Sequence, residues 1–120
     1  MRENRPFSFS RCERLLKRIE FKGVTCQGKR YTSPGFIVYV KENNLGRCRL
    51  GIAASRKVGK AIRRNRLKRL VREFFRLNKF RLPASCDILV VCRWDCQVDD
   101  LATTTEELSQ VLFPLARAQG

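Results

Sequence analysis

Residues 59–76 read GKAIRRNRLKRLVREFFR, a stretch that combines dense positive charge with the apolar spacing of a helix. Its apolar residues recur at steps of three and four, which places them on one stripe that faces a core. This stripe consists of Leu67, Leu70, Val71, Phe74 and Leu77. Basic and polar residues follow the same steps on the opposite side, with Arg64 on the flank. They are Asn65, Lys68, Arg69, Arg72 and Arg76. We therefore predict a helix with one packed face and one basic face.

The positive charge of the chain is concentrated in and around this helix. Residues 56–81 contain twelve Lys or Arg and one acidic residue, Glu73, so they carry +11 of the formal net charge of +15. Residues 1–55 carry +8, whereas residues 82–120 carry −4. A face that serves only solubility normally mixes both signs. A nearly uniform basic face beside an apolar stripe is typical of a nucleic-acid-binding protein.

The rest of the chain predicts one α+β domain of the split α/β type, which spans residues 1–120. Ser10 and Glu13 form a capping box that begins a first helix. The turn-forming residues 42–46 separate two strand patterns, which we expect to pair as a hairpin. Pro114 should kink or shorten the last helix. The expected elements are a helix over about 11–20, strands over 36–40 and 47–54, the basic helix to about residue 78, a strand over 87–93 and a helix from Thr103. They predict a sheet of three or four strands.

The residue types present disfavour catalysis by the protein itself. The chain has no histidine, which excludes a Ser-His-Asp triad and acid–base chemistry by histidine. A two-metal nuclease needs carboxylates beside the bound phosphate, but the carboxylates from Asp87 to Glu107 lie in the C-terminal third, away from the basic helix. We therefore predict no catalytic residue and no metal site in the protein.

Six cysteines, at positions 12, 26, 48, 86, 92 and 96, contain no C-x₂-C pair, so a structural zinc site has no support. Cys48 alternates with Leu50 and Ile52 in one strand pattern. In the last strand pattern, one face is formed by Cys86, Ile88, Val90, Cys92 and Trp94. We interpret the cysteines as reduced, core-filling side chains.

No segment of the sequence has the properties of a membrane span. The longest apolar runs, 36–40 and 88–92, are far too short to cross a bilayer, and residues 1–6 lack the apolar run of a signal peptide. A basic amphipathic helix could lie on an anionic membrane, but so small a protein needs the apolar stripe for its core. We expect a cytoplasmic protein without a membrane partner.

Aromatic residues on the first helix and first strong strand are candidates for contact with unpaired bases. Stacking of a base on an aromatic ring is worth about 1–3 kcal/mol and tolerates any sequence. Each aromatic residue alone is more typical of a core. Tyr39 alternates out of phase with Phe36 and Val38, so we expect it to be the exposed one on its strand.

Residues 57–73, KVGKAIRRNRLKRLVRE, resemble the signature segment of the bacterial ribonuclease P protein subunit, whose hallmark is Arg-Asn-Arg followed by Lys-Arg and a further Arg. The resemblance covers nearly the whole chain, because the first helix and the strands follow in the family's order and spacing. Only the last helix, with Pro114, is a loose fit. The resemblance implies a left-handed crossover of strand, basic helix and strand, against the right-handed norm.

The resemblance also implies a function, as part of a ribonucleoprotein that removes the 5′ leader from precursor tRNA. The chemistry would belong to a catalytic RNA subunit and its Mg²⁺ ions, with no organic cofactor and no obligate protein partner. The residues that would bind the catalytic RNA are Arg64, Asn65, Arg66, Lys68, Arg69 and Arg72. Those that would hold the single-stranded leader are Phe21, Phe36, Tyr39, Ser55, Arg56 and Lys57. Many family members have a second aromatic residue where this chain has Thr25, which implies weaker stacking at that end of the cleft.

Two other classes of function remain open from the residues alone. One is a pure RNA-binding module, such as a ribosomal or double-stranded-RNA-binding protein, that has no catalytic partner. The other is a free-standing nuclease, which the missing acid–base groups disfavour. Adding the protein to precursor tRNA with and without the catalytic RNA distinguishes all three.

Overall fold

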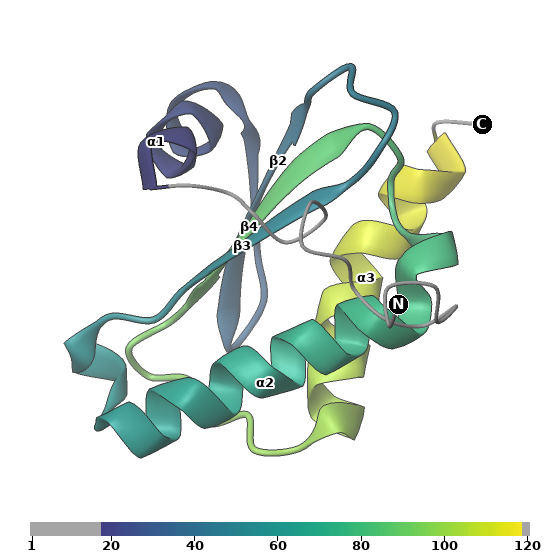
Figure 1. Ribbon diagram of the computed structural model, residues 1–120. Coiled ribbons are helices and arrows are strands. Elements are labelled where there is room, and N and C mark those ends of the chain that lie inside the picture. Colours follow the sequence, from purple (N-terminus) through teal and green to yellow (C-terminus); the bar gives the residue numbers. More distant parts are fainter. Residues whose placement is uncertain (1–17, 119–120) are drawn as a thin grey trace, which may run out of the picture.

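The computed structural model describes residues 18–118, with side chains described for residues 23–117, and consists of one sheet with helices on both faces (Figure 1). The capping box at Ser10 lies outside the described residues. The elements are α1 (Arg18–Gln27), β1 (Lys29–Thr32), β2 (Phe36–Glu42), β3 (Arg49–Ala53), the 3₁₀ turn η2 (Arg56–Val58), α2 (Ala61–Asn78), the 3₁₀ turn η3 (Lys79–Arg81), β4 (Cys86–Cys92) and α3 (Leu101–Ala118). The predicted basic helix and the strands at 36 and 87 are thus confirmed, and so is the α+β class.

The predicted hairpin between β2 and β3 is wrong. The strand order is β1-β2-β4-β3, so β4 separates the two strands and pairs antiparallel with β2 and parallel with β3. The sequence of β4, CDILVVC, is apolar on both faces apart from Asp87, and six of its seven residues are buried. A strand that is apolar on both faces is most stable in the middle of a sheet, where helices can cover both sides.

Strand β1 was not expected from the sequence. It has only four residues, KRYT, of which three are exposed, and it forms one edge of the sheet beside β2. Short, charged edge strands are common because they resist pairing with other chains. The connection to β2 is held by α3, since Oε1 of Glu107 accepts hydrogen bonds from Ser33 Oγ and the Gly35 N–H, each at 2.8 Å.

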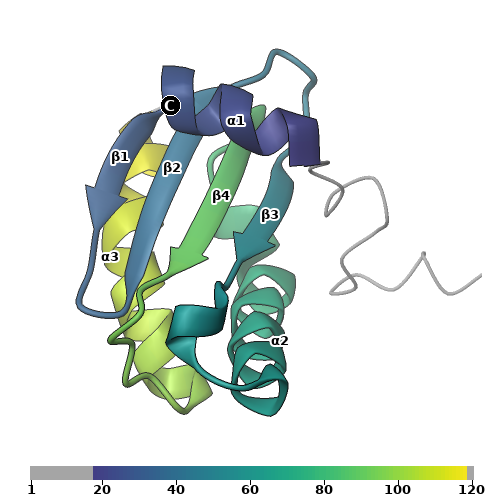
Figure 2. The same ribbon diagram turned by 90° about the vertical axis from the view of Figure 1, so that its left-hand side faces the viewer.

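The connection from β3 through α2 to β4 has the rare hand. Figure 2 shows the two parallel strands running in the same direction with α2 behind them, and β4 lies on the side that makes the crossover left-handed. About 98% of such connections are right-handed. The fold therefore carries the basic helix in a strand–helix–strand unit of unusual topology, as the resemblance implied.

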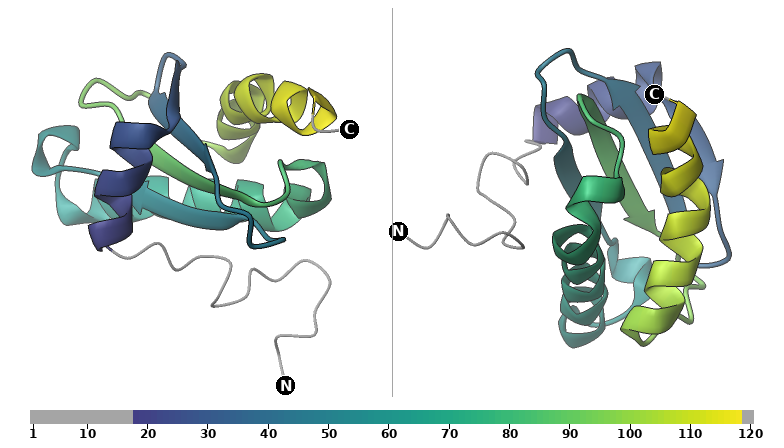
Figure 3. Two further views of the ribbon diagram at one scale, coloured as in Figure 1. Left: turned by 90° about the horizontal axis from the view of Figure 1, so that it is seen from above. Right: turned by 90° about the vertical axis from the view of Figure 1, so that its right-hand side faces the viewer.

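The main core lies between the sheet and the pair α2 and α3, which cover the same face (Figure 3). Phe74 and Phe75 of α2 are fully buried, and the Phe74 ring stacks on Phe113 of α3 with centroids 6.1 Å apart. Leu77, which was predicted on the buried stripe, is 41% exposed, and Phe75 occupies the core instead. The stripe of α2 is therefore shifted by part of a turn near its end.

The last helix begins two residues earlier than predicted and is not shortened by proline. Asp100 Oδ1 accepts a hydrogen bond from the Thr103 N–H at 2.8 Å, which satisfies an amide of the first turn. Pro114 lies inside the helix, which continues to Ala118.

The cysteines differ in their surroundings more than the strand pattern suggested. Cys86, Cys92 and Cys96 are buried, and burial raises the pKa of the Cys92 thiol to about 12. Cys48 is half-buried, whereas Cys26 is exposed, so the core-filling prediction is wrong for Cys26. Cys12 lies outside the described residues.

Candidate RNA interface

The basic face of α2 points away from the core, as its helical spacing predicts. Asn65, Arg69 and Arg72 are exposed, and Lys68 is half-buried at the edge of this face. Within residues 18–118, no ion pair or side-chain hydrogen bond joins Arg69 or Arg72 to the protein. Two uncompensated guanidinium groups one helical turn apart repel each other, and a phosphate backbone removes that repulsion.

Arg66 and Arg64, in contrast, are already engaged within the protein. Arg66 Nε donates to Oδ1 of Asp99 at 2.7 Å, and its Nη2 donates to the Asp99 carbonyl. The neighbouring Arg63, which was not predicted as a site residue, reaches the same carboxylate and donates to the Cys96 carbonyl at 2.9 Å. Arg64 is half-buried and donates from Nε to the Gly59 carbonyl at 3.2 Å. The Arg-Asn-Arg motif therefore serves structure as well as charge.

The start of α2 is built to remain open. Gly59 has φ of 151°, a conformation that side chains rarely adopt, and a Cβ there would lie 3.1 Å from Arg63 Cγ. Lys60 is the N-cap residue, and no described side chain caps this end or places an acidic group in its first turn. Uncapped amides and the helix dipole favour an anion at this position.

The opposite face of the sheet is covered only in part. Val24 of α1 packs on Leu89 of β4, and α1 crosses one end of the sheet (Figure 2). The register places the remaining residues of this face in adjacent rows across three strands. Four half-exposed residues, Ile37, Tyr39, Ala53 and Val91, form what we call the open sheet face.

The six predicted leader-binding residues do not all lie on this face. Tyr39 does, and it also packs against the Val24–Leu89 contact. Phe36 does not, because its side chain is fully buried on the α2 and α3 side, so assigning it a stacking role is wrong. The ring of Phe21 lies outside the described side chains, while Thr25, one turn later, is exposed.

The other predicted cleft residues lie at the end of β3. Ser55, Arg56 and Lys57 are all exposed, and the last two belong to η2. The open sheet face is therefore flanked by cations on this side. On the other side, Arg30 of β1 lies directly opposite Tyr39. Arg30 was missed because the four residues of β1 are too few to show a strand period in the sequence.

A buried ion pair closes one end of this face. Arg49 donates twice to the Asp87 carboxylate at 2.7 Å, and Asn43 Nδ2 donates to it at 2.8 Å. Burial alone would raise the pKa of Asp87, but these hydrogen bonds and the charges of Arg49 and Lys41 lower it. The carboxylate is therefore charged and does not act as an acid.

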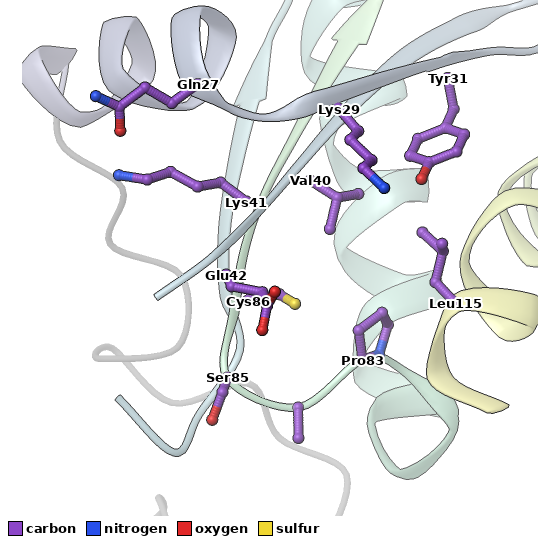
Figure 4. A pocket seen from close by; sticks show the side chains of 11 residues that line it. Gln27, Lys29, Tyr31, Val40, Lys41, Glu42, Pro83, Ser85, Cys86 and Leu115 are labelled. Carbon is purple, nitrogen blue, oxygen red and sulfur yellow. The ribbon is translucent and has the colours of Figure 1, made fainter. Parts of the chain in front are cut away.

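One open groove lies away from these residues. It has a volume of about 930 Å³ and runs between β1, β2 and the segment before β4 (Figure 4). Lys29, Lys41 and Tyr31 line it, together with Pro83 and Leu115. None of the predicted RNA-binding residues contributes to it, so we do not include it in the site.

Known proteins match both the sequence and the fold. The family model for ribonuclease P matches residues 9–116. The ribonuclease P protein component of Syntrophus aciditrophicus is 38% identical over 108 residues, which cover 90% of this chain and 91% of that protein. The solved structure of the RNase P protein from Thermotoga maritima is 40% identical, with a TM-score of 0.75 over 85% of this chain and 96% of that one. The structure from Staphylococcus aureus is 30% identical, with a TM-score of 0.75 over 82% and 91%.

Proposed function

This chain belongs to the ribonuclease P protein family, and from that premise we propose how its surfaces divide the work of binding RNA. The family works in maturing the 5′ ends of tRNA, as part of an endoribonuclease that contains an RNA subunit, and that role is also the role of this protein. The proposal concerns the finer questions of which RNA each face holds and what the protein leaves to its partner.

We propose that the exposed face of α2 binds the RNA subunit. The observation that carries this assignment is the pair Arg69 and Arg72, whose charges have no partner within residues 18–118. Asn65 and Lys68 extend the same face, and Arg64 and Arg66 flank it. Such contacts read phosphate and not base sequence, which suits a helix that holds a folded RNA in position.

The open sheet face and the cations at the end of β3 are proposed to bind the 5′ leader of precursor tRNA. Half-exposed apolar side chains and the Tyr39 ring offer flat contacts to unpaired bases. Arg56 and Lys57 lie where the backbone of such a strand would leave the sheet. A double helix could not stack on this surface, so the same features favour the leader over the folded tRNA.

The chemistry of phosphodiester hydrolysis is assigned to the RNA subunit and to Mg²⁺ that it mainly binds. Among residues 18–118, no three His, Cys, Asp or Glu side chains gather so that they could hold a metal ion. The donor set of these described residues does not favour such a site, and we propose that the protein contributes no Mg²⁺ ligand and no catalytic residue. No described helix is long and apolar enough to cross a membrane. We propose a cytoplasmic location because the protein acts on tRNA precursors.

The leader assignment is tested by removing the Tyr39 ring. In the reconstituted holoenzyme, Tyr39→Ala should weaken binding of precursor tRNA by about 1–3 kcal/mol, the value of one lost stack. Binding of mature tRNA should change little, because it has no leader. The measurement is a pair of binding titrations at one fixed salt concentration, with Arg81→Ala as a control for a cation that lies at the far end of α2.

Equal weakening of both tRNAs would contradict the assignment. It would mean that Tyr39 supports α1 through the Val24–Leu89 contact and does not touch the leader. A thermal unfolding curve of the variant protein measures that structural contribution separately.

A further inference from the structure

The only tryptophan of the chain is exposed where the sequence pattern predicted it to be buried. Trp94 was expected on the same face as Cys92, but 69% of its surface is accessible. The strand ends at Cys92, so the alternation no longer applies two residues later. An exposed tryptophan costs free energy, since its large apolar surface remains in water. Within residues 18–118, no hydrogen bond or ring contact involves the Trp94 side chain.

The segment that carries Trp94 is held firmly. We call residues 93–96 the β4 turn, because the Cys96 N–H donates to the Arg93 carbonyl at 3.0 Å. On one side, the Arg93 N–H donates to the Gly35 carbonyl at 3.0 Å and extends the pairing with β2. On the other side, the Cys96 carbonyl accepts a hydrogen bond from the guanidinium of Arg63 in α2. Trp94 therefore stands at the tip of a turn that is fixed at both ends.

This turn lies where the open sheet face ends. Because β3 and β4 are parallel and Ala53 is paired with Val91, both strands terminate at the same end of the sheet. Figures 1 and 2 both show the segment after β4 beside η2 at this end. Arg56 and Lys57 of η2 are exposed there. A strand of RNA that crosses the open sheet face and leaves by this end passes both the cations and the β4 turn.

The charges around Trp94 also suit an RNA strand. The acidic side chain next to it, Asp95, accepts a hydrogen bond from Arg93 Nε at 3.2 Å, so the negative charge of Asp95 is compensated within the turn. The cations of η2, Arg56 and Lys57, have no acidic partner among the described ion pairs. The acidic residues near this end of the sheet, Asp95 and Asp99, pair with Arg93, Arg63 and Arg66 instead. An aromatic ring beside uncompensated cations is the combination that single-stranded nucleic acids bind.

We propose that Trp94 is a second stacking site, which holds an unpaired nucleotide of the leader beyond those on the open sheet face. This inference rests on the proposed function, because it extends the leader path by one contact. The occupant is the base of a single-stranded RNA, and any base suffices because each has a flat π-face. Because the β4 turn is already fixed before RNA binds, little conformational entropy is lost when a base stacks on the ring.

The lone tryptophan makes the test direct, because the intrinsic tryptophan fluorescence of the holoenzyme reports Trp94 alone. The holoenzyme is titrated with precursor tRNAs whose leaders are lengthened one nucleotide at a time, and with mature tRNA. Stacking should quench the emission once the leader is long enough to reach the β4 turn, and mature tRNA should leave it unchanged. In parallel, Trp94→Ala should weaken binding of long-leader substrates by at least about fivefold. Trp94→Phe should retain most of the affinity, and binding of mature tRNA should be unaffected.

Phe80→Ala is the matched control, since Phe80 is also an exposed aromatic residue (79%) but follows α2 at its other end. It should bind every substrate as the unmodified protein does. Emission that is independent of leader length, with Trp94→Ala binding all leaders normally, overturns the inference. If Tyr39→Ala still weakens precursor binding in that case, the proposed function stands without it. Quenching that is complete on assembly with the RNA subunit, before tRNA is added, also overturns it and assigns Trp94 to the RNA subunit.

Discussion

Among the described residues, Asp87 is the charged residue that the fold buries most fully. Only 4% of its surface is exposed, and it lies in the central strand, where an unpaired carboxylate would be very costly. Arg49 from β3 and Asn43 from the loop after β2 both donate to it, so one side chain joins three segments. The ion pair therefore fixes how β3 lies beside β4 in the unusual crossover.

Replacing this carboxylate should destabilise the protein in a pH-dependent way. Asp87→Asn leaves Arg49 without its counter-charge, and we expect a loss of about 3 kcal/mol in the free energy of unfolding at neutral pH. The pKa of Asp87 is lowered in the folded state, so its contribution is fully present above the unfolded pKa of about 4 and is lost as the pH falls through the folded value. The difference between the two proteins, measured by urea unfolding, should therefore shrink as the pH falls from about 7 to about 3.

Asp95→Asn provides the control, because it removes an exposed ion pair and should cost less than about 1 kcal/mol. A loss at Asp87 that is as small as the loss at Asp95, or that does not change with pH, would show that the ion pair does not hold the two strands together.

Single residues also show which features of the structure a local sequence pattern cannot predict. The alternation in β2 correctly separated Tyr39 from Phe36, yet the resemblance assigned both to the leader cleft. Phe36 is excluded by burial, which depends on α2 and α3 covering that face of the sheet, and no local pattern contains this information. Trp94 shows the opposite error, since the pattern was extended two residues beyond the end of the strand.

At the scale of elements, α2 was the most predictable part of the chain. Its bounds follow from apolar spacing over five turns, and most of its residues, such as Ala, Leu, Arg and Lys, also favour a helix. The strands were harder, because the pairing of β2, β3 and β4 depends on which strand needs cover on both faces. The apolar residues on both faces of β4 indicate that it needs such cover, but the turn-forming residues 42–46 between β2 and β3 suggested a hairpin instead. β1 was missed because four residues are too few to show a period.

The basic face of α2 leads to a prediction about salt. Arg69→Ala and Arg72→Ala should each reduce the slope of log K against log salt concentration for the RNA subunit by roughly one unit, since each guanidinium is free to neutralise one phosphate. Arg76→Ala should reduce it less. Arg76 follows one turn later on the same face, but Glu73 already accepts its Nε hydrogen at 2.9 Å. The measurement is a set of binding titrations over a range of salt concentrations.

Equal slopes for Arg69→Ala, Arg72→Ala and the unmodified protein would show that this face does not contact phosphates. A larger effect at Arg76 than at Arg69 would place the RNA nearer the end of α2, around η3.

At the scale of the molecule, the two faces of the sheet have separate tasks. One face carries the core, with α2 and α3, and the outer side of α2 bears the basic residues. The other face keeps half-exposed apolar residues next to exposed cations. Residues 93–100 connect the two, because Arg63 and Arg66 of α2 bind Asp99 and the Cys96 carbonyl in this segment. We therefore expect a leader on the sheet and an RNA subunit on α2 to be held at a fixed distance from each other.

The division of charge along the chain anticipated this arrangement better than any motif did. The excess of +11 in residues 56–81 predicted one basic surface, and the chain places it on α2 and η2. What composition could not show is the hand of the crossover, which came from the family resemblance and depends on how β4 enters the sheet.

The central claim is that this protein supports cleavage of precursor tRNA only as a partner of a catalytic RNA. The most direct measurement is cleavage of a 5′-labelled precursor tRNA by the purified protein, by the RNA subunit and by the two together, each in a buffer with Mg²⁺. We predict no cleavage by the protein alone, and efficient release of the leader as one fragment when both are present. Specific removal of the leader by protein free of RNA and of contaminating nuclease would contradict the account, because it would require a catalytic centre within the chain itself.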